Sequence, residues 1–231
     1  MTSHRGWTQR AALSLSLISL LTLGGTKRAH LIQNLEAGQR QTIVAYGTSL
    51  TANATWVAAL QEFFETRYPS QATVLNRGQG AASSKWGLKY LPEQVIQNTP
   101  NTLFLEFAIN DAFQPYQISV EDSRQNLRKM LNRVLRVSPN CEIVLLLLSE
   151  PHGVHRKLRP DWELYYSVYR EVARERGLLL IDLTAAWKPL ARDPLRLDAY
   201  FPDGIHLSPL ADREIVTPGI LEALGVSARP K

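Results

Sequence analysis

One serine, one aspartate and one histidine of this 231-residue chain occur where they could act together in acyl transfer. Ser49 follows a short apolar run, and Asp203 and His206 are three residues apart near the C-terminal end. Residues three apart on a helical turn share a face, so Asp203 could accept a hydrogen bond from Nδ1 of His206. Nε2 would then be free to accept the proton of a serine hydroxyl, as in a Ser-His-Asp triad.

Each of these residues also has an ordinary structural explanation. A serine between a strand and a helix is often a helix cap, and Asp203 could precede a helix with His206 on the surface. The string around Ser49 is not the G-x-S-x-G nucleophile elbow. No G-x-x-x-x-G-K phosphate loop is present. Beyond residue 40, the candidate bases are the three histidines His152, His155 and His206.

The sequence supplies no metal-binding pattern. His152 and His155 are three residues apart, but no carboxylate or cysteine is spaced to complete a site with them. A single cysteine, Cys141, excludes an internal disulfide and any multi-cysteine metal site. It begins an apolar run, where a buried packing role is expected. We therefore assign no metal and no cofactor.

The elements that would position these residues follow an alternating pattern. After residue 40, apolar runs alternate with amphipathic stretches, as in a parallel sheet covered by helices. Strands are expected at residues 42–46, 72–75, 102–107, 141–148 and 178–181. Helices are expected near residues 53–68, 86–97, 120–137, 162–176 and 209–224. The predicted fold class is α/β, a three-layer α/β/α sandwich, with its functional side chains at the carboxyl ends of the strands.

Four short blocks follow this pattern in a fixed order. They are GTSL at 47–50, NRGQG at 76–80, AIND at 108–111 and DGIH at 203–206. These resemble the four blocks of the SGNH hydrolases, the GDSL-like lipases and acylhydrolases, and the last is a full match. The resemblance spans residues 41–224. Any one block is weak evidence, but four in the family's order are strong.

The resemblance implies a flavodoxin-like five-stranded parallel sheet with strand order 2-1-3-4-5, and ester hydrolysis through an acyl-enzyme. Carried onto this chain, it makes Ser49 the nucleophile. His206 would take the serine proton and later deliver it to the leaving alkoxide, while Asp203 would orient and stabilise the imidazolium.

The same resemblance implies an oxyanion hole. Its donors would be the backbone N–H of Ser49, the side-chain amide of Asn110 and one backbone N–H of the glycine block. The family's glycine falls at Ala81, one residue after Gly80. We favour Gly80 because a sharp turn after a strand favours glycine, and Ala81 is the alternative. Thr48 replaces the acidic residue of Gly-Asp-Ser-Leu, a position that supports the loop.

Several other residues fall near this site in the sequence. Trp86, Phe113 and Tyr116 are on the loops nearest the nucleophile, where they could stack on a sugar or an acyl chain or simply pack as walls. Glu106 is unusual inside a buried strand. It either pairs with a basic residue or faces the adjoining helix at a polar gap.

The N-terminal residues have an organisation of their own. Arg5 and Arg10 precede an apolar stretch at 11–23, which resembles a secretory signal peptide. This stretch is short and serine-rich for a transmembrane helix, and no clean cleavage site follows it. We expect residues 1–40 to be a signal peptide or weak membrane anchor with a linker, and 41–231 to be one SGNH hydrolase domain. The expected location is periplasmic, secreted or N-terminally anchored, with the cytoplasm as the alternative.

The charge distribution bears on the partners. The net charge is +5, and residues 1–40 hold five basic residues against one acidic residue, so the remainder is about neutral. A groove for nucleic acid is therefore not expected.

We predict a hydrolase of O-acyl esters of carbohydrates or lipids. The alternatives are an O-acyltransferase using the same site and an inactive SGNH-fold binding protein. A nucleotide or flavin binder is disfavoured, because no phosphate-cradling signature is present.

Overall fold

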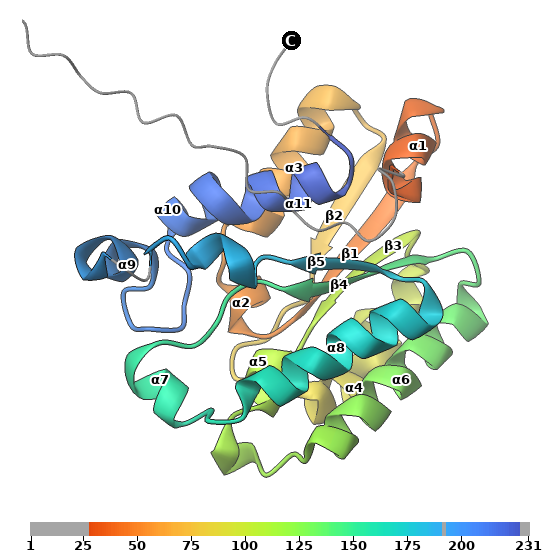
Figure 1. Ribbon diagram of the computed structural model, residues 1–231. Helices are drawn as coiled ribbons and strands as arrows, with labels where there is room; N and C mark the ends of the chain where they lie inside the picture. Colours follow the sequence, from red (N-terminus) through yellow and green to blue (C-terminus); the bar gives the residue numbers. More distant parts are fainter. Residues whose placement is uncertain (1–27, 191–192, 227–231) are drawn as a thin grey trace, which may run out of the picture.

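A computed structural model of the protein describes residues 28–190 and 193–226. Its centre is a parallel sheet of five strands in the order β2-β1-β3-β4-β5 (Figure 1). The strands are β1 (Gln41–Gly47), β2 (Ala72–Asn76), β3 (Thr102–Glu106), β4 (Glu142–Leu147) and β5 (Leu179–Asp182). The predicted fold class and strand order are confirmed.

Helices cover both faces of this sheet. Helices α1, α3 and α11 lie on one face and α4, α6 and α8 on the other (Figure 1), while several short helices follow the strands directly. The helices are α1 (His30–Glu36), α2 (Ser49–Ala52), α3 (Trp56–Arg67), α4 (Ser84–Gln94), α5 (Ala108–Asp111), α6 (Val120–Val137), α7 (Gly153–Lys157), α8 (Trp162–Arg176), α9 (Pro194–Tyr200), α10 (Pro209–Ala211) and α11 (Thr217–Ala223). A π-helical turn, Asp212–Val216, joins the last two.

Local sequence explains the bounds of the two longest helices. Ser119 caps α6 by accepting a hydrogen bond from the backbone N–H of Asp122. Acidic residues in the first turn stabilise the helix further, because their negative charge lies near the positive end of the helix dipole. Helix α8 ends at Gly177, whose φ of +62° is in the left-handed region that glycine adopts without strain. Both helices have the bounds expected from the sequence.

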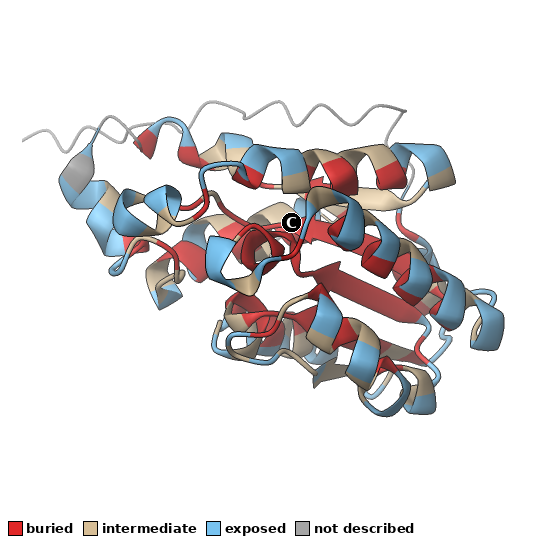
Figure 2. Ribbon diagram, turned by 90° about the horizontal axis from the view of Figure 1, so that it is seen from below, coloured by how far each residue is buried: buried red, intermediate tan, exposed pale blue. Residues whose placement is uncertain are grey.

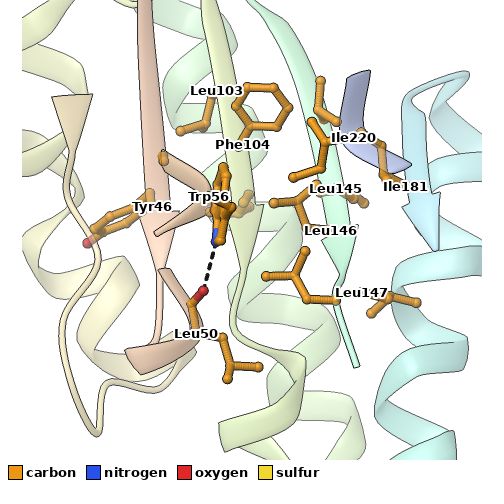
Figure 3. Packing of buried hydrophobic residues seen from close by; sticks show 14 of the residues in the cluster. Tyr46, Leu50, Trp56, Leu103, Phe104, Leu145, Leu146, Leu147, Ile181 and Ile220 are labelled. Carbon is orange, nitrogen blue, oxygen red and sulfur yellow. Dashed lines mark hydrogen bonds between the residues drawn. The ribbon is translucent and has the colours of Figure 1, made fainter. Parts of the chain in front are cut away.

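The core fills the space between the sheet and its helices. Figure 2 shows buried residues along the strands and on the inward faces of the helices. Trp56 of α3 is fully buried, packs edge-to-face on Phe104 of β3, and donates its indole N–H to the carbonyl of Leu50 at 2.8 Å (Figure 3). The core thereby fixes α2, the helix that begins at Ser49, against the sheet.

Helix α1 lies in the segment that we expected to be leader and linker. Leu31, Ile32 and Leu35 are buried in the core. The Glu142 carboxylate, at the start of β4, accepts hydrogen bonds from the backbone N–H groups of His30 and Leu31 at 2.8 Å each. This segment is therefore part of the packed structure rather than a free linker.

The signal-peptide prediction concerns residues before 28 and lies outside the described residues. Among the helices that the structure describes, none is long and apolar enough to cross a membrane.

Candidate active site

The loop that carries Ser49 is held from below by a buried carboxylate. Thr48, rather than Ser49, caps α2, because its Oγ1 accepts a hydrogen bond from the backbone N–H of Leu50 at 3.1 Å. The same hydroxyl donates to Oε1 of Glu106 at 2.7 Å. A Cβ at Gly47 would lie 2.6 Å from that oxygen, so this position requires glycine. The Ser49 hydroxyl is left free of any capping role.

Ser49, His206 and Asp203 are hydrogen-bonded in series. Oγ of Ser49 lies 2.9 Å from Nε2 of His206, and Nδ1 of His206 lies 2.5 Å from Oδ2 of Asp203. Because the carboxylate accepts the Nδ1–H, Nε2 is the acceptor of the serine hydroxyl. This arrangement can remove the serine proton as the hydroxyl attacks a carbonyl carbon.

Asp203 is prepared to hold the imidazole. Burial would raise the pKa of its carboxyl, but hydrogen bonds from the His206 side chain and from the backbone N–H groups of His206 and Ile205 outweigh burial and lower the pKa to about 2. The two backbone bonds, at 2.8 and 3.0 Å, go to Oδ1 and leave Oδ2 for the imidazole. The carboxylate is therefore ionised throughout the neutral range.

The loop that carries Asp203 and His206 rests on the segment after β4. Gly204 has a φ of +87°, and a Cβ there would lie 2.9 Å from the carbonyl oxygen of His152. The backbone N–H of His152 donates to the carbonyl of Gly204 at 2.7 Å, and the His152 ring packs on Phe201 at 4.6 Å. His152 thus supports the loop by packing.

The glycine block after β2 docks against α2. A Cβ at Gly78 would lie 2.3 Å from the backbone nitrogen of Ala52, so only glycine allows this approach. Asn76 donates its side-chain amide to the carbonyl of Thr51 at 3.0 Å, and the backbone N–H of Gln79 donates to the carbonyl of Gly47 at 2.9 Å. These bonds bring the residues after Gln79 beside the loop that carries Ser49.

The sharp turn of this block falls at Ala81. Ala81 has a φ of +58°, whereas Gly80 is not in the left-handed region. Our reason for favouring Gly80, that the turn would need glycine there, is therefore wrong. The carbonyl of Ala81 accepts a hydrogen bond from the Tyr116 hydroxyl at 2.8 Å.

The block after β3 braces the same turn. Asn110 is buried in α5, and its Nδ2 donates to the carbonyl of Ala82 at 2.9 Å. Asp111 is also buried, and its Oδ1 accepts the backbone N–H of Ser84 at the start of α4, at 2.7 Å. Asp111 therefore caps the start of α4, and Asn110 keeps a second amide hydrogen for another partner.

Glu106 has an unusual protonation equilibrium. Burial raises the pKa of its carboxyl to about 7, although hydrogen bonds from Thr48 and Thr51 work in the opposite direction. Its Oε1 accepts the backbone N–H of Thr48 at 2.7 Å and the hydroxyl of Thr51 at 3.1 Å. Of our two explanations for Glu106, the second holds: it faces the adjoining helix α2, and among the described residues it forms no ion pair.

A small cavity of about 160 Å³ opens beside the Ser49 hydroxyl. Its walls are formed by Ser49, Leu50, Asn53, Ala54, His206 and Leu207. Binding sites for drug-sized molecules usually have volumes of about 300–1,000 Å³, so this cavity is smaller than most of them.

The three aromatic residues predicted near the site do not line this cavity. Trp86 packs on Tyr46 at 5.6 Å. Phe113 and Tyr116 pack edge-to-face at 5.0 Å, and the guanidinium of Arg159 lies 4.7 Å from the Phe113 ring. Their contact with a substrate stays a prediction.

Two contacts of this site were not predicted from the sequence. Nη2 of Arg159 donates to Oδ1 of Asn110 at 3.3 Å, and the hydroxyl of Tyr116 donates to the carbonyl of Ala81. No motif marks either contact. Within residues 28–190 and 193–226, no group of three or more His, Cys, Asp or Glu side chains could hold a metal ion.

The fold and the site define a class. An open five-stranded parallel sheet, with a serine after its first strand and an aspartate–histidine pair before the last helices, is the architecture of SGNH-type hydrolases. A model of the GDSL-like Lipase/Acylhydrolase family matches residues 42–213, well over half of the chain. The chain belongs to this family and is a carboxylic ester hydrolase.

Individual relatives are distant. An isoamyl acetate-hydrolyzing esterase 1 homolog of Mus musculus is 23% identical over 197 residues, which cover 74% of this chain and 76% of the relative. A GDSL esterase/lipase of Arabidopsis thaliana is 24% identical over 201 residues, which cover 74% and 80%.

Solved structures share the fold. An acetylxylan esterase from Geobacillus stearothermophilus superposes with a TM-score of 0.69 at 18% identity, covering 83% of this chain and 98% of that one. A lipase/acylhydrolase from Enterococcus faecalis gives a TM-score of 0.68 at 23% identity, covering 83% and 100%.

Proposed function

We propose that this chain hydrolyses short O-acyl esters through a covalent acyl-enzyme on Ser49. The observation that carries the proposal is the hydrogen-bonded series of Ser49, His206 and Asp203 beside a small cavity. A serine hydroxyl is a weak nucleophile unless an adjacent base takes its proton, and His206 is in place to do so.

The reaction would proceed in two halves. In the first, Oγ of Ser49 bonds to the ester carbonyl carbon while Nε2 of His206 takes the hydroxyl proton. The tetrahedral intermediate then collapses, and His206 delivers that proton to the departing alkoxide. In the second half, His206 takes a proton from the water that attacks the acyl carbonyl carbon. It returns this proton to Oγ of Ser49 as the second tetrahedral intermediate collapses and releases the carboxylic acid. Asp203 stabilises the imidazolium in both halves.

The negative charge on the carbonyl oxygen needs donors. We assign the backbone N–H of Ser49 and the second Nδ2–H of Asn110 to this task, together with one N–H of the glycine block. With the conformational argument for Gly80 removed, Gly80 and Ala81 are equal candidates for the third donor. Removal of one such donor typically costs about 10²–10³ in turnover.

The size of the cavity points to the acyl group. At about 160 Å³, the space beside Ser49 suits an acetyl or similarly short chain. The names of two similar proteins specify acetyl esters, isoamyl acetate in one and acetylxylan in the other. We therefore propose acetyl esters of carbohydrates or small alcohols as the substrate class.

The test is turnover of p-nitrophenyl acetate, butyrate and octanoate, together with labelling by a fluorophosphonate probe. We expect the acetate to be preferred, and Ser49→Ala to abolish both turnover and labelling. A wild-type protein that neither turns over these esters nor reacts with the probe would refute the proposal and favour an inactive binding protein. A protein that reacts with the probe but transfers acyl groups only to a sugar acceptor would instead be an O-acyltransferase.

We also propose that the N-terminal segment directs export or weak membrane association. Its basic start and its apolar stretch at 11–23 support this proposal. Cell fractionation of the full chain and of a chain beginning at residue 28 tests it. Equal retention of both in the cytoplasm would contradict it.

A further inference from the structure

Arg159 is a buried arginine beside Asn110. It lies between α7 and α8 with 5% of its surface exposed. Its Nε donates to the carbonyl of Ile109 at 2.8 Å, its Nη2 donates to Oδ1 of Asn110 at 3.3 Å, and its guanidinium lies over the ring of Phe113 at 4.7 Å. All three partners belong to α5 and the residues that follow it.

The guanidinium is also held from its other side. Its Nη1 lies 3.3 Å from Nδ1 of His155, on α7. Among the residues that the structure describes, no carboxylate forms an ion pair with Arg159. Burial of an arginine without such a partner has a large desolvation penalty. If this side chain only filled space in the fold, an apolar residue would give a higher free energy of unfolding.

The contacts of Asn110 allow only one orientation of its amide. A guanidinium can only donate, so the atom that faces Arg159 must be the carbonyl oxygen Oδ1. A backbone carbonyl can only accept, so the atom that faces Ala82 must be Nδ2. An amide flipped by 180° would lose both bonds. The second hydrogen of Nδ2 therefore has a fixed direction.

We propose that Arg159 is a positioning residue for catalysis, because it holds and polarises the Asn110 amide so that its free N–H meets the developing oxyanion. This inference rests on the proposed function, in which Asn110 is an oxyanion donor. Donors of this kind contribute most when their direction is fixed before the reaction begins. Arg159 does not touch the substrate and acts through Asn110.

The first test is the kinetics of Arg159→Met on p-nitrophenyl acetate. Because the oxyanion forms only in the transition state, kcat should fall by at least about tenfold while KM stays within about twofold. The matched control is Arg156→Met, three residues earlier in α7, where half of the side chain is exposed. The control should keep wild-type kcat. A kcat for Arg159→Met within about threefold of wild type overturns the proposal.

The second test is a double-mutant cycle. Asn110→Ala alone should lower kcat by about 10²–10³. If Arg159 acts through Asn110, adding Arg159→Met to that variant should change kcat by less than about twofold, because the group it positions is already absent. A double variant in which the two losses multiply contradicts the proposal.

Arg159→Lys guards against loss of folding, since it keeps the positive charge and most of the stem. An ammonium cannot replace both Nε at Ile109 and Nη2 at Asn110, so kcat should still fall by at least about fivefold, with the melting temperature close to wild type. Wild-type kcat in this variant overturns the proposal. Failure of the proposed function itself would give a different result, because Ser49→Ala would then have the same turnover of p-nitrophenyl acetate as the wild type.

Discussion

Replacing Glu106 by glutamine removes a single buried ionisable group beside the loop that carries Ser49. Glutamine keeps the shape of the side chain and an oxygen that can accept the bonds from Thr48 and Thr51, but it removes the ionisable group. Glu106 is 3% exposed, and burial raises the pKa of its carboxyl from 4.5 to about 7. The substitution should therefore alter how stability depends on pH.

The sign follows from which state holds the proton. Between pH 4.5 and about 7 the folded protein keeps the proton on Glu106, whereas the unfolded chain has released it. The stability that this group contributes is present below pH 4.5 and is lost as the pH rises through about 7. A pKa difference of about 2.5 corresponds to roughly 3 kcal/mol. The wild type should lose about this much relative to Glu106→Gln over that range.

Urea unfolding of both proteins between pH 4.5 and 8 measures the difference. Both proteins retain Asp111, whose carboxyl pKa burial raises to about 6, so its own titration contributes to both profiles. Glu62→Gln, at an exposed position on α3, is the matched control for the loss of one carboxylate. If the difference in the free energy of unfolding between wild type and Glu106→Gln changes by less than about 1 kcal/mol across this pH range, then Glu106 titrates alike in the folded and unfolded states and the prediction is wrong.

Four further predictions concern single sites. Asp203→Asn should lower kcat by about 10⁴ without unfolding the protein, because the imidazole loses the acceptor that fixes its tautomer; steady-state kinetics would show it. Ala81→Gly should raise the free energy of unfolding by about 0.5–1 kcal/mol in urea titrations, since glycine adopts a φ of +58° without strain. Glu142→Ala should cost about 1 kcal/mol and speed proteolysis near α1, whose N–H groups it caps, with esterase activity retained. Leu145→Ala should cost about 2–5 kcal/mol in the same titrations, because this side chain is fully buried; an effect below about 1 kcal/mol would contradict the packing.

The regular elements could be predicted because their signals are local. The continuous apolar run at 141–148 indicates a central strand, and β4 spans Glu142–Leu147. Helix α6 could be recognised from its apolar stripe and its cap alone. Such patterns depend on residues a few positions apart and do not need the rest of the chain.

Elements that depend on distant partners could not be predicted in this way. Helix α1 has seven residues, which are too few to form a stable helix alone. It forms because its apolar side packs in the core and because Glu142, 111 residues away in the sequence, caps its N-terminal end. The segment at 209–224 was expected to be one helix, but a π-helical turn at Asp212–Val216 interrupts it. There, Oδ2 of Asp212 accepts the backbone N–H of Thr55 at 2.6 Å, a contact with the start of α3.

By itself, the sequence determined the α/β class and the four blocks from which the candidate residues come, because these are encoded by residue types at short spacings. Only the tertiary structure brought Ser49 within 2.9 Å of His206, 157 residues away, and showed that Thr48 is the helix cap. It also decided that Glu106 supports the loop that carries Ser49 and that Arg159 donates a hydrogen bond to Asn110. Such contacts arise between loops that become neighbours only once the parallel strands are aligned, so no local pattern records them.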